Sequence, residues 1–382
     1  MKKVKRDILF VAGIACVFIM ASLYGKSRLK ETQKHQLEEI FPATQFSLEQ
    51  VNSHKWHLSS SGLRASWYLY TGAGKGYNGP VTVLVQTDIE GNIVQVRITS
   101  NHETPSYFQK LEKNNFLETV SRIAVRNYLS GEPVNAVSGA TITSRAVLQG
   151  VRNGYSKGEN INLPEARRPS FGPLEIIVLF LLSTGIMLQW IRNRKVKRII
   201  LWSSLVISLV FLGFIYNQPV TVSRIVAVIN GYLPEVKHEF YLYLLLGGSV
   251  LTLVFTGRNV YCHSVCPFGA AQEILGKTGR AKTFLPAYYR KLKYLQWTIT
   301  FVAVTAALLL NNPSVAQYEV FGALFQLTAS NILFIVLIIV VGLSLFIRRP
   351  WCNFMCPVGS VFSYISLIRN TVGKLWRQTV YR

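Results

Sequence analysis

The chain has 382 residues, of which 50% are hydrophobic and 15% charged, and its formal net charge is +23. A mean hydropathy of +0.27 is too high for an ordinary soluble protein and predicts an integral membrane protein with a soluble part. The basic residues gather beside apolar runs, as in Lys2–Arg6 and Arg192–Arg198. That pattern is typical of membrane topology and argues against nucleic acid as a partner.

Residues 1–25 are predicted to form a membrane anchor. The apolar run Ile8–Tyr24 follows four basic residues. A cleaved signal peptide is the alternative, but no small-x-small cleavage site precedes the polar stretch at Lys26. We therefore expect an uncleaved anchor with a cytoplasmic N-terminus. Residues 26–60 are then expected to form a stalk, with a helix over Lys26–Glu49.

Residues 61–170 are polar and mixed, which predicts a small α+β domain. Two β-branched runs, Val81–Gln86 and Ile93–Ile98, flank the turn residues Asp88–Asn92 and predict a β-hairpin. Apolar periodicity predicts two helices, Phe116–Leu129 and Ser144–Tyr155.

Residues 171–382 are predicted to form a five-span membrane domain, since each apolar run approaches the ~20 residues that a bilayer requires. The spans are expected at residues 174–191, 199–216, 238–256, 294–311 and 327–347. Lys and Arg are frequent in the segment between the spans at 238–256 and 294–311 and in the C-terminal tail, whereas residues 312–326 contain neither. The fold class is therefore a six-span helical bundle with both termini in the cytoplasm and residues 61–170 outside it.

A short motif, C-x-x-x-C-P, occurs twice, at Cys262–Pro267 and Cys352–Pro357. Each copy follows an apolar run, so the predicted topology places both copies at the cytoplasmic face, where they can share one site. Four thiolates are the ligand set of one [4Fe–4S] cluster, and the motif matches the end of the bacterial ferredoxin run. Structural thiols and a zinc site are the alternatives. The predicted metal ligands are Cys262, Cys266, Cys352 and Cys356.

A second motif, Ser138-Gly139-Ala140-Thr141, lies directly before the second predicted helix. A tight turn with hydroxyl groups at a helix N-terminus favours an anion such as phosphate, and Arg145 adds positive charge. An ordinary Ser/Thr helix cap is the alternative on these local features.

The Ser138–Thr141 motif resembles the flavinylation motif of FMN-binding domains in the sodium-pumping quinone reductase and Rnf complexes and in NosR. This resemblance implies that a separate flavin transferase joins FMN through a phosphoester to Thr141, with Thr143 as the second choice. Gly76–Pro80 and His102–Pro105 are also similar to that family's sequences. The implied FMN-binding residues are Thr141, Ser138, Gly139, Ala140, Thr143, Glu103 and Thr104. The family's usual Asp and Gly are replaced by Asn135 and Ser106.

The order of anchor, FMN domain, five spans and two cysteine motifs resembles the NosR/NirI family and, by size, its RdhC/PceC-like members. The resemblance implies a membrane flavoprotein that passes electrons through FMN to an extracytoplasmic reductase in anaerobic respiration. A regulatory or maturation factor and a transporter are the alternatives. A hydrocarbon layer of ~30 Å would separate the FMN from the cysteines, so a relay such as a quinone is expected.

Overall fold

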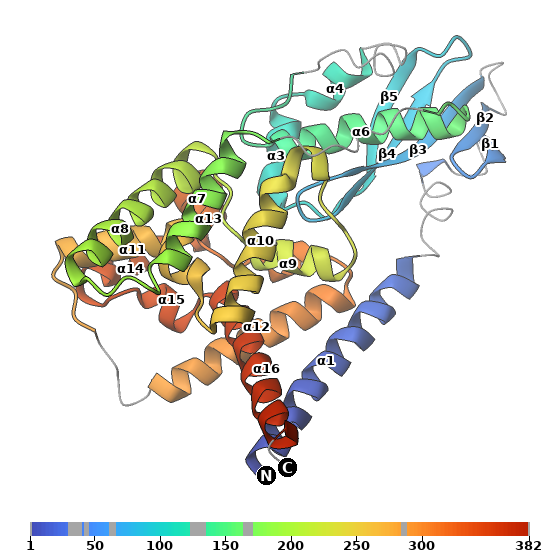
Figure 1. Cartoon of the computed structure of the whole chain (residues 1–382). Helices are drawn as coiled ribbons and strands as arrows, with labels where there is room; N and C mark the ends of the chain where they lie inside the picture. Colours follow the sequence, from blue (N-terminus) through green and yellow to red (C-terminus); the bar gives the residue numbers. More distant parts are fainter. Residues whose placement is uncertain are drawn as a thin grey trace.

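The computed structural model describes residues 2–29, 40–41, 46–60, 66–122, 135–162, 171–283 and 289–380. A mixed α/β domain and a helical domain lie side by side, and helix α1 (Lys2–Leu29) runs along the helical domain (Figure 1). Phe18 of α1 stacks on Phe301 with ring centroids 5.5 Å apart. The N-terminal helix is therefore packed against the rest of the chain along part of its length.

The mixed domain contains one antiparallel sheet in the order β1-β2-β3-β4-β5. Its strands are β1 (Phe46–Asn52), β2 (Lys55–Ser60), β3 (Ser66–Lys75), β4 (Pro80–Thr87) and β5 (Ile93–Ser100). The predicted hairpin is present, since β4 and β5 pair through the Asp88–Asn92 turn, where Asn92 donates its backbone N–H to the carboxylate of Asp88.

Residues 46–60, which the sequence assigned to the stalk, form β1 and β2 of this sheet instead. The alternation of polar residues with the buried Trp56 and Leu58 is the signal that marks them as strand. Both side chains pack against Leu69 and Leu84 on one face of the sheet. The predicted helix over Lys26–Glu49 is therefore wrong from Phe46 onward, where the chain is strand. Residues 26–29 are helical, as the last residues of α1, and residues 30–39 and 42–45 lie outside the described part.

Helix α6 (Thr141–Gly158) covers the other face of the sheet and begins three residues earlier than predicted (Figure 1). Its apolar side buries Ala146, Val147 and Val151 against β3 and β4. The approach is so close that a Cβ on Gly74 of β3 would lie 1.9 Å from the carbonyl oxygen of Ala146. Two further helices are α3 (Pro105–Lys113) and α4 (Phe116–Ser121). The helix predicted over 116–129 is present as α4 up to Ser121 and has ended at Arg122, and residues 123–129 lie outside the described part.

Four helical segments of the described chain are long and apolar enough to cross a membrane: Leu9–Ser27, Arg194–Ile215, Val236–Thr256 and Tyr289–Leu309. They lie in α1, in α8 (Arg194–Ile207) with its continuation η1 (Ser208–Ile215), in α10 (Val236–Thr256) and in α12 (Tyr289–Leu309). The other two predicted spans correspond to shorter apolar helices, α7 (Pro173–Met187) and α14 (Asn331–Phe346).

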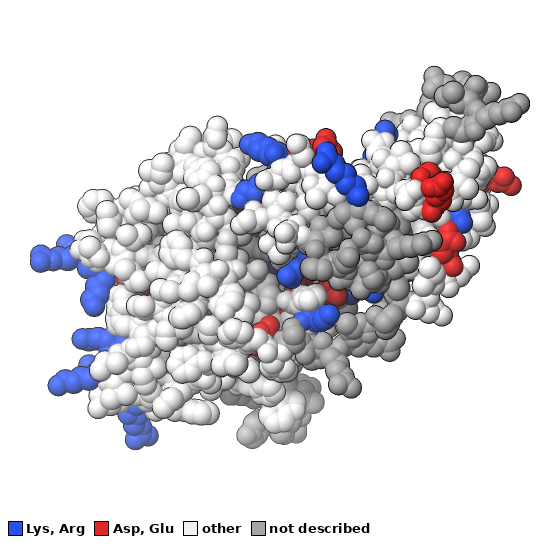
Figure 2. All heavy atoms as spheres, turned by 90° about the horizontal axis from the view of Figure 1, so that it is seen from above, with Lys and Arg blue, Asp and Glu red and all other residues white. Residues whose placement is uncertain are grey.

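Short helices connect and cap these long ones. They are α9 (Val222–Ile229), η2 (Tyr261–Val265), α11 (Pro267–Thr278), η3 (Pro313–Ala316), α13 (Phe321–Phe325) and α15 (Pro350–Phe354), followed by the long α16 (Pro357–Val380). One large apolar core joins α7, α10, α11, α13, α14 and α16. Lys and Arg side chains project from the edge of this domain that lies farthest from the sheet domain, and acidic side chains gather over the sheet domain (Figure 2).

Candidate functional site

The two C-x-x-x-C-P copies lie in different short helices, η2 and α15, but share two features of backbone structure. In each, the second Cys comes directly before a helix that begins at the motif's Pro, as expected for Pro in a first helical turn. Its backbone N–H donates to the carbonyl of the residue before the first Cys: Cys266 to Tyr261 at 2.7 Å and Cys356 to Trp351 at 2.9 Å. The internal repeat suggested by the sequence is therefore also a repeat of backbone geometry.

The four motif cysteines line one cavity of about 290 Å³. Cys266 and Cys356 are buried, and Cys262 and Cys352 are half-buried. Burial raises the pKa of all four thiols, that of Cys352 to about 12, and the neighbouring cysteines raise those of Cys262 and Cys356 further. The thiols are thus protonated when nothing is bound, and metal binding must displace their protons.

Basic side chains balance the charge that four thiolates would bring. Lys293 of α12 and Arg349 line the cavity together with the cysteines. Arg349 donates from Nη1 to the carbonyl oxygen of Cys262 at 2.8 Å and from Nε to Glu273 at 2.7 Å, which ties the second copy to the first. Glu273 also accepts from Nε of Arg348 at 2.8 Å. Burial alone raises the pKa of Glu273, but the two arginines lower it below its ordinary value.

The four thiols are a candidate ligand set for an iron–sulfur cluster. Within the described residues, no three His, Cys, Asp or Glu side chains are close enough together to hold one metal ion. Four thiols that face one cavity match the ligand set of a [4Fe–4S] cluster. The backbone N–H of Gly359 also points at Sγ of Cys356, 3.4 Å away, and hydrogen bonds to sulfur tune the potential of such clusters.

The flavinylation-like motif forms the turn that leads into α6. Gly139 has φ +75°, a left-handed conformation that glycine adopts without strain. Helix α6 begins at Thr141, which is exposed, and no side chain of a described residue caps its first turn. Lys110 lies over the turn, since a Cβ on Gly139 would come within 2.9 Å of Nζ. An exposed hydroxyl, an uncapped helix N-terminus and an ammonium group together fit a phosphate.

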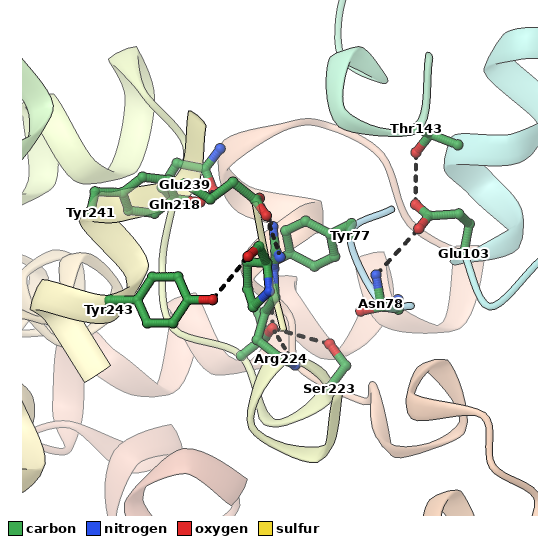
Figure 3. A network of polar contacts seen from close by, with 12 residues as sticks. Tyr77, Asn78, Glu103, Thr143, Gln218, Ser223, Arg224, Glu239, Tyr241 and Tyr243 are labelled. Atoms are coloured by element: carbon green, nitrogen blue, oxygen red, sulfur yellow. Dashed lines mark hydrogen bonds and ion pairs between the residues drawn. The ribbon is translucent and has the colours of Figure 1, made fainter. Parts of the chain in front are cut away.

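The two threonines of the motif have different surroundings. Thr143, one turn into α6, is buried and donates to Oε2 of Glu103 at 2.7 Å, whereas Thr141 faces solvent. Oε1 of Glu103 accepts from the backbone N–H of Asn78 at 3.2 Å (Figure 3). Burial raises the pKa of Glu103 despite these hydrogen bonds. Hydrogen bonds of Glu103 therefore join the Gly76–Pro80 loop to the start of α6, while Thr141 stays exposed to solvent.

A polar network at the junction of the two domains was not predicted from the sequence. Arg224 of α9 is buried and pairs with Glu239 of α10, with Nη1 3.2 Å from Oε2. The guanidinium of Arg224 lies over the ring of Tyr77, 3.8 Å from its centroid (Figure 3). The Tyr77 hydroxyl is 3.3 Å from that of Thr221. The available signal was the single Arg within the apolar stretch 220–229. Thr104, the residue directly before α3, also contacts the other domain: its hydroxyl donates to the side-chain oxygen of Gln317 in the helical domain.

Two domain families match the chain. Residues 76–156 match the FMN-binding domain, and residues 240–286 with 331–374 match the 4Fe-4S binding domain. The first match contains the turn before α6, and the two parts of the second each contain one cysteine motif. The chain is therefore an FMN-binding membrane protein with a 4Fe-4S binding domain.

Curated relatives point the same way. The chain is 30% identical to Protein NirI of Paracoccus denitrificans over 186 residues, which are 43% of this chain and 27% of NirI. It is 22% identical to Regulatory protein NosR of Stutzerimonas stutzeri over 173 residues, which are 41% of this chain and 24% of NosR. It is also 27% identical to one protein of the proton-translocating ferredoxin:NAD(+) oxidoreductase complex of Clostridium ljungdahlii. That match covers 153 residues, which are 37% of this chain and 82% of the Clostridium protein.

The matches thus span about a quarter of NirI and of NosR but most of the Clostridium protein. They confirm the predicted resemblance to the NosR/NirI type and support a membrane electron-transfer flavoprotein. The comparison with RdhC/PceC-like proteins stays a prediction.

Proposed function

We propose that this protein carries FMN as a phosphoester on Thr141 and one [4Fe–4S] cluster on Cys262, Cys266, Cys352 and Cys356. With both groups bound, the chain would transfer electrons through the FMN to an extracytoplasmic reductase or its cofactor in anaerobic respiration. The observation that carries this proposal is the convergence of both cysteine motifs on one cavity in a chain that also matches an FMN-binding domain. The flavin and the cluster supply the redox chemistry.

The residues of the chain hold and tune these groups. Thr141 tethers the flavin, Thr143 and Glu103 fix the first turn of α6, and Lys110 offsets phosphate charge. Lys293 and Arg349 offset the negative charge of four thiolates in the cavity. A separate flavin transferase attaches the FMN, and a quinol is a candidate electron donor.

The proposed topology has six spans, with both termini and the cysteine motifs toward the cytoplasm and the FMN domain outside. The basic edge of the helical domain supports this orientation, since cytoplasmic loops are rich in Lys and Arg (Figure 2). The short α7 and α14 cross with the help of flanking residues, because the bilayer thins around spans of 15 or 16 residues.

A regulatory or maturation role is the alternative, favoured by the similarity to a protein named as the regulatory protein NosR. In that role the chain would signal to, or deliver electrons for the maturation of, a respiratory reductase.

The covalent flavin is tested on a denaturing gel of the full chain, co-expressed with a flavin transferase. We expect a fluorescent band that Thr141→Ala abolishes and that Thr119→Ala, at an exposed threonine of α4, retains. A band that survives Thr141→Ala and disappears in Thr143→Ala would move the attachment to Thr143. Reduction of the FMN by quinol in liposomes supports electron transfer, and no reduction by any quinol favours the regulatory role.

A further inference from the structure

One segment of the helical domain, residues 313–325, touches both candidate redox sites. We call it the docking segment; it contains η3 and α13 and joins α12 to α14. The hydroxyl of Tyr318 lies 3.1 Å from that of Thr300, in the middle of α12, so the segment enters the helical bundle instead of passing over its end. Irregular backbone at such a depth is stable only when protein surrounds it, and Ala316, Val320 and Phe321 are buried.

On its outer side the docking segment holds the FMN domain. The side-chain oxygen of Gln317 accepts hydrogen bonds from the hydroxyl of Thr104 and, at 3.4 Å, from the side-chain amide of Asn78. Thr104 follows Glu103, which bonds Thr143 in the first turn of α6 (Figure 3). Gln317 is therefore connected by side-chain hydrogen bonds and one peptide link to the turn that carries Thr141.

A second pair of contacts holds the same face of the FMN domain. His102 stacks on Tyr232 of the segment after α9, with ring centroids 5.6 Å apart. Tyr77 lies over Arg224 at 3.8 Å. The loops around Tyr77 and His102 thus meet the helical domain at several points, which together hold the FMN domain in the docked position seen here.

On its inner side the docking segment reaches the thiol cavity. Phe321 lines the cavity beside Cys262 and Cys356. Its ring centroid is 5.2 Å from that of Phe268, two residues after Cys266. Gln317 and Phe321 are four residues apart, so their Cα atoms are separated by at most ~14 Å.

We propose that the docking segment fixes the FMN domain on the membrane domain and thereby sets a direct electron-transfer distance between the flavin and the cluster, with no quinone between them. Each transfer oxidises the cluster by one electron and reduces the flavin by one; two transfers with two protons from water reduce the flavin fully. An external one-electron donor restores the cluster. This inference rests on the proposed function and replaces the relay across ~30 Å that the sequence alone required.

The test uses the full chain with both cofactors in quinone-free nanodiscs, reduced by a flash-generated one-electron donor. We expect a fast phase in which electrons pass from the cluster to the flavin at a rate independent of protein concentration. Gln317→Ala loses this fast phase, and so does Thr104→Val, which removes the same hydrogen bond from the other domain. Gln326→Ala, a glutamine just beyond the docking segment, retains it.

A second measurement does not depend on turnover. Magnetic coupling between the reduced cluster and the flavin radical is expected in the wild type and in Gln326→Ala, and is weakened in Gln317→Ala. Electron exchange that appears only on addition of a quinone, or equal rates and equal coupling in Gln317→Ala and the wild type, would overturn the inference. A wild-type chain that lacks the cluster or the flavin would instead contradict the proposed function.

Discussion

The flavin turn and the thiol cavity are built in opposite ways. Residues 138–143 form the proposed flavin turn from one continuous stretch, and the hydroxyl of Thr141, the proposed attachment point, is exposed. The thiol cavity is formed by two segments that lie 90 residues apart in the sequence, Cys262–Cys266 and Cys352–Cys356, and these cysteines are wholly or partly buried. A tethered cofactor needs only a reactive side chain that an attaching enzyme can reach. A coordinated cluster needs several ligands that converge on one cavity, which the repeat provides, and charged groups around them, such as Lys293 and Arg349.

The largest effect is expected when one of the four thiols is removed. We expect Cys356→Ser to lose the bound iron, because a hydroxyl is a poor substitute for a thiolate and no fifth cysteine of the described chain lines the cavity to replace it. Iron and acid-labile sulfide analysis of anaerobic protein measures this. Cys16→Ser is the matched control, since Cys16 is exposed on α1, and it should keep its iron while both variants keep the flavin. Full iron content in Cys356→Ser would exclude the four-thiolate site.

A buried charge pair of the helical domain, Arg224 with Glu239, lies where the FMN domain meets it. Arg224→Leu leaves Glu239 buried without its partner, which we expect to lower the free energy of unfolding by ~3–5 kcal/mol. Arg122→Leu, in an exposed pair with Glu118, should change it by at most about 1 kcal/mol. Chemical unfolding of the detergent-solubilised chain measures both. If the double variant Arg224→Met/Glu239→Leu is as unstable as Arg224→Leu, the loss is one of packing instead of charge.

The docking segment should also make stability depend on pH through Glu319. Burial raises its pKa from 4.5 to about 7, and Oε2 has no hydrogen-bond partner in the described structure. Since protonation is favoured in the folded chain, this stabilisation is complete below pH 4.5 and is lost as the pH rises through 7. The difference is ~3 kcal/mol. Unfolding measured from pH 4 to 8 should show this fall in the wild type and a flatter profile in Glu319→Gln; identical profiles would contradict it.

The smallest effect is expected at the flavin turn. Lys110→Met removes a cation near the phosphate and should weaken noncovalent FMN binding to the Thr141→Ala chain by ~0.3–1 kcal/mol. The difference should shrink at high salt because ions screen exposed charges. Lys113→Met on the same helix is the control. If the Thr141→Ala chain binds FMN equally well at low salt with and without Lys110→Met, Lys110 does not contact the phosphate.

The sequence predicted what depends on neighbouring residues. The β4–β5 hairpin, the helix after Ser138–Ala140 and the repeat of the cysteine motifs follow from turn residues and spacing. It missed β1 and β2, where the alternation is short and contains few apolar residues. It also missed the pair of Arg224 with Glu239, which meets where α9 lies beside α10, and the pair of Gln317 with Thr104, which meets only where the two domains dock. Composition and periodicity carry no information about such contacts.

The central claim is that one chain holds a flavin at Thr141 and a cluster in the four-thiol cavity. It is tested most directly by the ratio of iron to covalently bound flavin in the anaerobically purified full chain. The account predicts about four iron atoms per flavin. A fully flavinylated protein with iron at background level would contradict it.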